Sequence, residues 1–444
     1  MDGQQKLTAP VSVLLALTLM LSCTPWRHPA PPVSVPSISQ VSGESVSLPG
    51  NDIYEGVYDP ALAAQGANSF AFELAAILAE KAGDDSFVCS PISVWFPLAA
   101  LFNATAAEHR ADLAKALGAE GLSKESFNEA ASSIMAALTN AEVPESDRYN
   151  PLQIANAIFI SNLCTVSPTF ANTFEEYYQG NAMSVDFTSQ ETVDLINKWA
   201  SDHTEGLIDN LIESVEVFSR DTVAAIANAI YYSDRWISEF DENQTKPGAF
   251  HSPSGDVDAM FMSKQGDGMP YYEDSSLQAI DLKLSAGGGM YILLPKDGNA
   301  TKLLSEMSQS RLDEIAGAMQ ASSGKLLLPR FQIEGAAIEL NETLESLGIP
   351  LFDASKEPIS GYELIGESTP LFISKALQKA MIKVDEKGTT AAAVTIMAIS
   401  RTSAPMPTDP FEMVCDKPFA FVLYGPAAGI SSQALFIGAV KAPN

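Results

Sequence analysis

The chain has 444 residues, 46% of them hydrophobic, which is enough for one large domain or two. Its 55 acidic and 26 basic residues give a formal net charge of −29. This balance argues against nucleic-acid binding, which relies on lysine and arginine to neutralise phosphates. We interpret the acidic charge as a source of solubility rather than as a site for a cationic partner.

The N-terminal segment has the pattern of a targeting signal. Lys6 precedes an apolar run, Val11–Leu21, that is followed by a small residue and then Cys23. The run is too short to span a bilayer as a stable helix. The pattern resembles a bacterial lipoprotein signal, so residues 1–23 are predicted to be a signal peptide ending at Cys23, the lipidated residue. Thr24 follows in place of an aspartate, which favours the outer membrane over the inner one. A simple cleaved signal of a secreted protein is the alternative.

Residues 24–66 are predicted to form a flexible tether. Ser, Pro and Val dominate Pro29–Gly50, and such a composition buries too little apolar area to offset the entropy of ordering the chain. The folded domain is expected to span residues 67–444. It begins with an amphipathic helix over Ser69–Lys81, where apolar residues recur at helical spacing.

Short motifs follow in order along the domain. Phe87–Ser93 predicts a buried strand that runs into a helix, with Ser90 at the N-cap. Ala227–Tyr232 predicts a central strand, and Trp236 follows it. The later motifs are Leu326–Phe331 and the two strands of a closing hairpin, Lys417–Phe421 and Leu435–Pro443.

The stretch with the least usual composition lies near the C-terminal end. Gly388–Ser400 has no charge and no proline, and its small and β-branched residues suit a strand. The polar segment Thr402–Asp409, which carries two prolines, is typical of an exposed loop. An uncharged run of this kind can lie in solvent or inside a sheet without leaving a charge unpaired.

The sequence Glu-Lys-Gly-Thr-Thr-Ala-Ala-Ala at Glu386–Ala393 is similar to the hinge of the serpin family. Together with the motifs before and after it, this hinge makes the chain resemble serpins from about Ala67 to Asn444, in particular bacterial lipoprotein members. The resemblance implies an α+β fold with three β-sheets, about nine helices and an exposed reactive-centre loop.

The resemblance also implies a mechanism in which the chain is an inhibitor and supplies no catalytic residue. A protease would cut the loop and form an acyl-enzyme, and the loop would then insert as a new middle strand of the main sheet. The hinge would consist of Glu386, Gly388, Thr389, Thr390, Ala391, Ala392 and Ala393. The region where the sheet opens would include Ser90, Ser93, Asn228, Trp236 and Gln378. Gln378 stands where many members have a histidine, and its amide can bond across the sheet toward Asn228 without being pH-sensitive.

The resemblance implies a count from Gly388 as in serpins, which places the reactive bond at Thr402–Ser403. Arg401, one residue earlier, suits trypsin-like pockets, and Thr402 suits elastase-like pockets. We therefore expect serine proteases of both specificities as targets, with cysteine endopeptidases as a further class. In an inserted strand the odd-numbered residues Thr389 to Ile399 would face the core, because successive side chains point to opposite faces.

Enzyme function is not expected. The four histidines, His28, His109, His203 and His251, lie in no hydrolase or zinc-site spacing. No metal and no cofactor are predicted, and sparse basic residues around Ala104–Ala119 predict no heparin site. Cys89, Cys164 and Cys415 are interpreted as buried free thiols, with one disulfide as the alternative. The other partners expected are a lipid membrane, through the N-terminal anchor, and no nucleic acid. We expect a monomer in the bacterial cell envelope.

Two other functions stay open at this point. One is a non-inhibitory serpin-fold surface lipoprotein with a binding or chaperone role. Non-inhibitory members tend to carry charge or proline in the run that follows the hinge, and this chain carries neither there. The other is a surface adhesin, for which the sequence has no feature of its own.

Overall fold

The computed structural model describes the backbone of residues 13–23 and residues 60–139, 152–334, 337–388, 410–425 and 432–443. These ranges contain ten α-helices. In chain order they are α1 (Pro60–Lys81), α2 (Pro91–Phe102), α3 (Ala107–Ala116), α4 (Lys124–Thr139), α5 (Pro168–Tyr178), α6 (Gln190–Asp202), α7 (Ala300–Ser305), α8 (Gln309–Ala318), α9 (Asn341–Ser346) and α10 (Gly361–Ile365).

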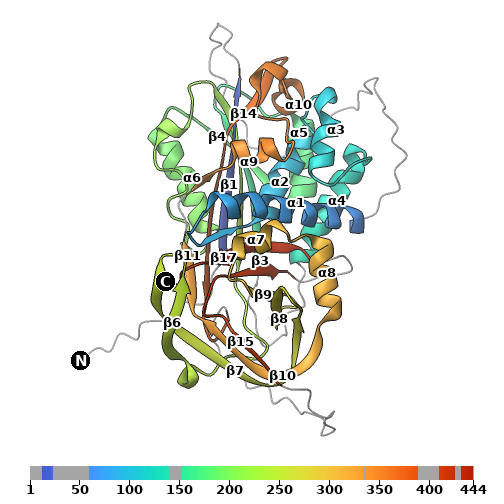
Figure 1. Ribbon diagram of the computed structural model, residues 1–444. Coiled ribbons are helices and arrows are strands. Elements are labelled where there is room, and N and C mark those ends of the chain that lie inside the picture. Colours follow the sequence, from blue (N-terminus) through green and yellow to red (C-terminus); the bar gives the residue numbers. More distant parts are fainter. Residues whose placement is uncertain are drawn as a thin grey trace, which may run out of the picture.

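The main sheet has eight strands and runs through the upper half of the molecule as drawn in Figure 1. Its spatial order is β11 (Phe331–Glu334), β14 (Pro370–Val384), β1 (Val13–Cys23), β5 (Thr222–Tyr232), β3 (Leu152–Ser161) and β4 (Gly180–Val185), while β12 (Ile338–Glu339) and β13 (Ile359–Ser360) also pair with β14. The pairs are antiparallel except for β3 with β4. The strand formed by the N-terminal apolar run thus lies in the middle of the sheet, drawn in dark blue beside β14.

The remaining strands form two further sheets that share one long strand, β7 (Gly255–Glu273). Residues 255–261 of β7 pair with β6 (Lys246–Ser252), residues 261–271 of β7 pair with β10 (Gln320–Pro329), and β10 pairs with β15 (Phe411–Val414). The end of β7 continues into β8 (Leu277–Lys283), β9 (Gly289–Pro295), β16 (Phe419–Tyr424), β17 (Ala434–Val440) and β2 (Phe87–Cys89). The predicted α+β fold with three sheets is confirmed, and the described residues have ten helices where about nine were expected.

The main sheet is covered on both faces, which explains why β5 is apolar along nearly its whole length. Ile226 and Ile230 belong to the large core that also contains α1, α2 and α4. Ala225 and Ala227, on the opposite face, belong to a smaller core under α6. A strand buried on both faces has a continuous apolar run rather than an alternating one.

Helix α1 begins at Pro60, earlier than both the predicted helix at Ser69 and the predicted domain start at 67. Its early turns are helical because small residues let them pack closely: Ala63 and Ala64 are buried, and Gly66 contacts Gly118 so tightly that a Cβ would overlap its backbone. By length and composition, residues 61–81 could span a membrane, but more than half of this stretch is buried inside the fold, as expected of a core helix.

Candidate functional site

A tight turn, Asp385–Gly388, follows β14 and leads into the segment 389–409, which lies outside the described residues. Gly388 pairs antiparallel with Asp385, across the turn, and with Arg235, just beyond the end of β5. Its φ of 84° lies in the left-handed region, and an added Cβ would lie 2.5 Å from the Trp236 nitrogen. Glycine is therefore required here by both conformation and space. Gly388 thus lies between the turn that follows β14 and the segment that follows β5.

Trp236 holds the turn at Asp385–Gly388 through two hydrogen bonds. Its backbone N–H donates to the carbonyl of Lys387 at 3.2 Å, and its indole Nε1–H donates to the carbonyl of Asp385 at 2.9 Å. The side chain is buried. Trp236 therefore contacts the base of the hinge, at Asp385 and Lys387.

Glu386 is the electrostatic anchor of the turn. It is buried and forms an ion pair of 2.7 Å with Arg330, which comes from the connection between β10 and β11, and it also accepts a hydrogen bond from Thr245. Burial works against ionisation, but the hydrogen bonds from Arg330 and Thr245 outweigh it, so the pKa of Glu386 lies below its usual range. The neighbouring Asp385 has a raised pKa, chiefly because it is buried. At neutral pH a charged Glu386 thus fixes the hinge to the frame of the molecule.

Asp234 and Arg330 also belong to this site, and sequence reasoning assigned no role to either residue. Asp234 is fully buried and accepts hydrogen bonds from the Tyr232 hydroxyl, the Arg235 N–H, the Ser285 hydroxyl and the Ala286 N–H. The four donors hold the chain between β5 and Trp236 against the loop at Ser285. The only sequence signal was a carboxylate where many serpins have a glycine, and it did not point to these partners.

Below the hinge, β1 lies between β5 and β14 and pairs with both. Leu14 to Cys23 are opposite Met381 to Leu371 of β14, and Val13 to Ser22 are opposite Tyr232 to Thr222 of β5. This apolar run was predicted to be the core of a signal peptide. In the folded chain it is the strand that fills the slot between β5 and β14, and we use the name slot for this space.

A chain of buried hydrogen bonds runs beneath the sheet beside the slot. Ser93 of α2 donates its hydroxyl proton to the side-chain oxygen of Asn228, the Asn228 amide donates to the Asn156 oxygen at 2.9 Å, and the Asn156 amide donates to the Tyr178 carbonyl at 2.7 Å. All four residues are buried. The network connects α2, β5, β3 and α5 through polar groups in an otherwise apolar core.

Gln378 does not make the bond toward Asn228 that its amide could form. It donates instead to the Ser90 carbonyl at 3.1 Å. The reason is β1: Leu17 is opposite both Asn228 and Gln378, so a whole strand separates the two amides. The Gln378 side-chain oxygen and the Ser90 hydroxyl are buried without a hydrogen-bond partner. Ser90 occupies the N-cap position of α2, and its side chain makes no capping bond.

Comparison with known proteins agrees with this architecture. The family model described as Serpin (serine protease inhibitor) matches residues 65–443. The chain is a serpin. An uncharacterized serpin-like protein of Thermococcus kodakarensis is 27% identical over 98% of this serpin and 99% of its own length. The leukocyte elastase inhibitor of Bos taurus is 30% identical, covering 84% of this chain and 97% of its own.

A solved structure, human thyroxine-binding globulin in complex with its thyroxine ligand, has the same fold as this serpin. Its TM-score is 0.73 at 22% identity, and the match covers 87% of this chain and 99% of the globulin. The relatives thus include a protein named as a protease inhibitor, and a protein named for binding thyroxine has the same fold.

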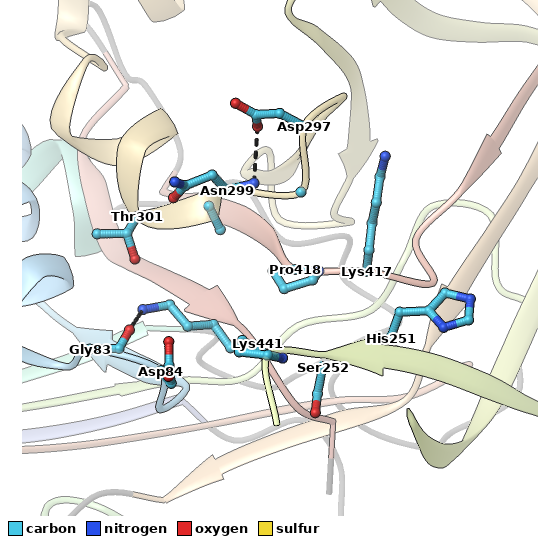
Figure 2. A pocket seen from close by; sticks show the side chains of 13 residues that line it. Gly83, Asp84, His251, Ser252, Asp297, Asn299, Thr301, Lys417, Pro418 and Lys441 are labelled. Carbon is cyan, nitrogen blue, oxygen red and sulfur yellow. Dashed lines mark hydrogen bonds between the residues drawn. The ribbon is translucent and has the colours of Figure 1, made fainter. Parts of the chain in front are cut away.

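Figure 2 shows a surface pocket of the serpin, lined by Gly83 and Asp84 after α1 and by Lys417 and Lys441. Lys441 donates to the Gly83 carbonyl, and Lys417 donates to the Lys296 carbonyl at 2.8 Å. Because both ammonium groups already bond to backbone, we assign no ligand to this pocket. It is separate from the hinge and the slot.

The other predicted site residues fall outside the described part of the serpin or have only their backbone described. Cys23 is the last residue of β1. The hinge residues Thr389, Thr390, Ala391, Ala392 and Ala393 and the reactive-bond residues Arg401, Thr402 and Ser403 lie outside the described residues.

Within the described ranges, no group of three or more His, Cys, Asp or Glu side chains could hold a metal ion. Cys89 and Cys415 are buried, Cys164 is half-buried, and none of the three is in a disulfide. Burial raises the pKa of both Cys89 and Cys415 far above the ordinary range, so both stay as thiols.

Proposed function

We propose that this serpin is a suicide-substrate inhibitor of serine endopeptidases, with cysteine endopeptidases as a further target class. The observation that carries the proposal is the hinge. Gly388 is paired antiparallel with Asp385 on one side and with Arg235 on the other, so the last residue before the loop lies between the turn that follows β14 and the segment that follows β5. A loop that continues in this direction would insert into the main sheet.

The slot supports the proposal because it can accept a complete strand. With β1 in place, β5 and β14 both form regular antiparallel ladders along the whole of the inserted strand, apart from one irregularity on each side. The sheet therefore admits an additional central strand without loss of its architecture. The run Gly388–Ser400 contains no charged residue and no proline, so it can be buried as a strand without leaving a charge unpaired.

The proposed chemistry uses the protease's own catalytic groups. The protease serine attacks the Thr402 carbonyl carbon, the Thr402–Ser403 amide bond breaks, and the new Ser403 amine takes its proton from the protease histidine. The ester that remains joins Thr402 to the protease. Insertion of about fourteen loop residues, at about 3.3 Å each, would carry the attached protease about 46 Å. Distortion of the oxyanion hole then stops deacylation, because that hole works only when it is preorganised.

Target choice and location belong to the same proposal. Arg401 and Thr402 support trypsin-like and elastase-like targets at adjacent bonds, and the relative named leukocyte elastase inhibitor is in keeping with the second class. The cysteine at position 23, directly after an apolar run, supports a lipid anchor that holds the inhibitor in the bacterial cell envelope, at the outer membrane.

The test of the function is a covalent complex with a target protease that survives detergent. Thr389 follows Gly388, and continuation of the Gly388 register would place it opposite Val384, which is buried in the main core. Thr389→Arg would therefore have to bury a cation, and several kcal/mol of desolvation would slow insertion by roughly a hundredfold or more. We expect this variant to be cut as a substrate without forming complex.

Thr390→Arg is the matched control. In the same register Thr390 lies opposite Lys383, which is half-exposed, so an arginine there keeps access to water. This variant should form complex nearly as well as the wild type. Equal complex from Thr389→Arg and wild type would contradict loop insertion, and absence of complex from the processed wild type across a protease panel would favour a non-inhibitory binding role.

A further inference from the structure

The N-terminal strand β1 lies in the place that the loop needs. The position can be calculated from pairings on the two sides of the slot. Antiparallel continuation from the pair of Gly388 with Asp385 would place Ala392 opposite Met381 of β14, and continuation from the pair of Gly388 with Arg235 would place Ala392 opposite Tyr231 of β5. Leu14 is opposite these same two residues. The pairings with β14 and with β5 thus both place Ala392 at the position that Leu14 occupies, and β1 runs in the direction that the loop would take.

The sequence of β1 suits a central strand. Leu15 is opposite Ile230 and Ala380, and Leu19 is opposite Ile226 and Ala376; all four of these partners belong to the main core. The odd-numbered positions of β1 before Cys23 are large apolar residues: Val13, Leu15, Leu17, Leu19 and Leu21. At the corresponding positions the loop carries Ala391, Ala393, Thr395, Met397 and Ile399. On hydrophobicity β1 therefore competes well with the loop for the slot.

The slot filled by β1 has buried polar atoms without partners at its centre, and these oppose the occupied state. Leu17 lies between Asn228 and Gln378, and the Gln378 oxygen and the Ser90 hydroxyl remain buried and unpaired. Buried polar atoms without partners destabilise the state that contains them. Removal of β1 would let the two neighbouring strands approach and Gln378 reach new partners. The occupied state is thus held by two hydrogen-bond ladders along an apolar strand, and the unpaired polar atoms at its centre oppose it.

We propose that Val13–Cys23 is an internal plug of the slot, which keeps the unprocessed chain from trapping proteases. The proposed position of Val13–Cys23 in the slot stands on the strand pairings, whereas its blocking role rests on the proposed inhibitory function. Hydrolysis of the Ser22–Cys23 peptide bond by a processing peptidase would detach every residue of β1 except the last. Processing would then convert a filled sheet into one that can accept its own loop.

The position of the plug is tested by a cross-link in the full chain. Cys23→Ser keeps residues 1–23 attached and removes one competing thiol. In this background Ala16→Cys with Ala229→Cys joins two residues that are direct partners, and mild oxidation should form a disulfide. Ala16→Cys with Ala225→Cys is the control, because Ala225 is on the same face but about 13 Å further along the strand, beyond the reach of a disulfide.

Amide hydrogen exchange supplies a second measurement on the Cys23→Ser chain without engineered cysteines. Residues 13–23 should be protected nearly as strongly as β5, because a strand bonded on both sides opens only with the sheet. Rapid exchange of residues 13–23, or equal cross-linking of the Ala229 and Ala225 pairs, would overturn the proposed position.

Inhibition is then compared between the Cys23→Ser chain and the processed wild type. We expect at least about tenfold less covalent complex from the Cys23→Ser chain, since its competent state is populated only when the plug leaves. Equal complex from both forms would overturn the blocking role. If the cross-link forms but the processed chain makes no covalent complex, the proposed position of the plug stands and the inhibitory function is contradicted. The two failures are therefore distinguishable.

Discussion

The ion pair of Glu386 with Arg330 shows how single residues hold the hinge. Glu386 is nearly fully buried, whereas the Arg330 side chain is 44% exposed, so solvent screens part of the attraction. A cation at this place is still required, because a buried carboxylate without a partner is strongly destabilising. The pair joins the hinge to the connection between β10 and β11, and this is a contact that the hinge can keep while the loop moves.

We predict that Arg330→Gln lowers the free energy of unfolding by about 1–2 kcal/mol at neutral pH, after allowance for screening by solvent. The folded pKa of Glu386 is depressed, so its contribution is present above the ordinary glutamate pKa and is lost as the pH falls through the folded value. Denaturant unfolding at several pH values should therefore show a difference between wild type and variant that is constant near neutrality and shrinks in strong acid.

The control for this prediction is Glu242→Gln. It removes the exposed 3.1 Å pair of Lys387 with Glu242, which lies next to the same turn. The change should alter stability by less than about 0.5 kcal/mol. A difference for Arg330→Gln that grew in acid would contradict the assigned charge state of Glu386.

Arg401 is the residue on which trypsin-like recognition is predicted to depend. Arg401→Ala should abolish complexes with trypsin-like proteases, whose pockets pair a cation with a carboxylate, and should leave elastase-like targets inhibited at Thr402–Ser403. Association rates against one protease of each class would measure this separation. Loss of both classes, or of neither, would exclude the use of two adjacent bonds.

At the scale of elements, the sequence predicted the order of the elements along the chain better than it predicted the contacts between distant residues. The turn at Gly388 and the strand at Ala227–Tyr232 could be located because composition and local motifs specify them. The contact of Arg330 with Glu386 could not, because the two residues are 56 positions apart and neither is unusual by itself. The four donors around Asp234 come partly from Ser285 and Ala286, which no local pattern connects with it.

Strand β1 illustrates the same limit for a whole element. Its run of leucines predicted an apolar targeting segment, and nothing in the run specifies strand pairing. A continuous apolar run fits a signal peptide and a doubly covered central strand equally well. The difference lies in the partners, β5 and β14, which are more than two hundred residues away in the chain.

The predicted anchor is tested on this element. Cys23→Ala should abolish membrane association, because no acyl chain can be attached without the thiol, and the variant should appear in the soluble fraction after cell lysis. A matched Cys164→Ala change, which alters a half-buried thiol in the folded domain, should leave fractionation unchanged. Membrane association of Cys23→Ala equal to that of wild type would exclude lipidation at this residue.

For the whole molecule, two segments are proposed to compete for one slot, and the stable state depends on which segment is free to fill it. With residues 1–23 attached, the sheet is already complete, so cutting the loop would add nothing to it. Once these residues are removed, the native sheet lacks a central strand, and the loop can supply it only after cleavage. Stability should therefore respond to cleavage in one form of the chain and not in the other.

This leads to a prediction for thermal unfolding. Limited cleavage within residues 401–409 of the processed chain should raise the unfolding midpoint by roughly 10–20 °C, since an inserted strand adds about ten hydrogen bonds, each with a net value near 1 kcal/mol. The same cleavage of the Cys23→Ser chain should shift the midpoint by no more than about 2 °C, since β1 holds the slot. An equal rise in both chains would show that the slot is free while the N-terminal segment is attached, and no rise in either would contradict loop insertion.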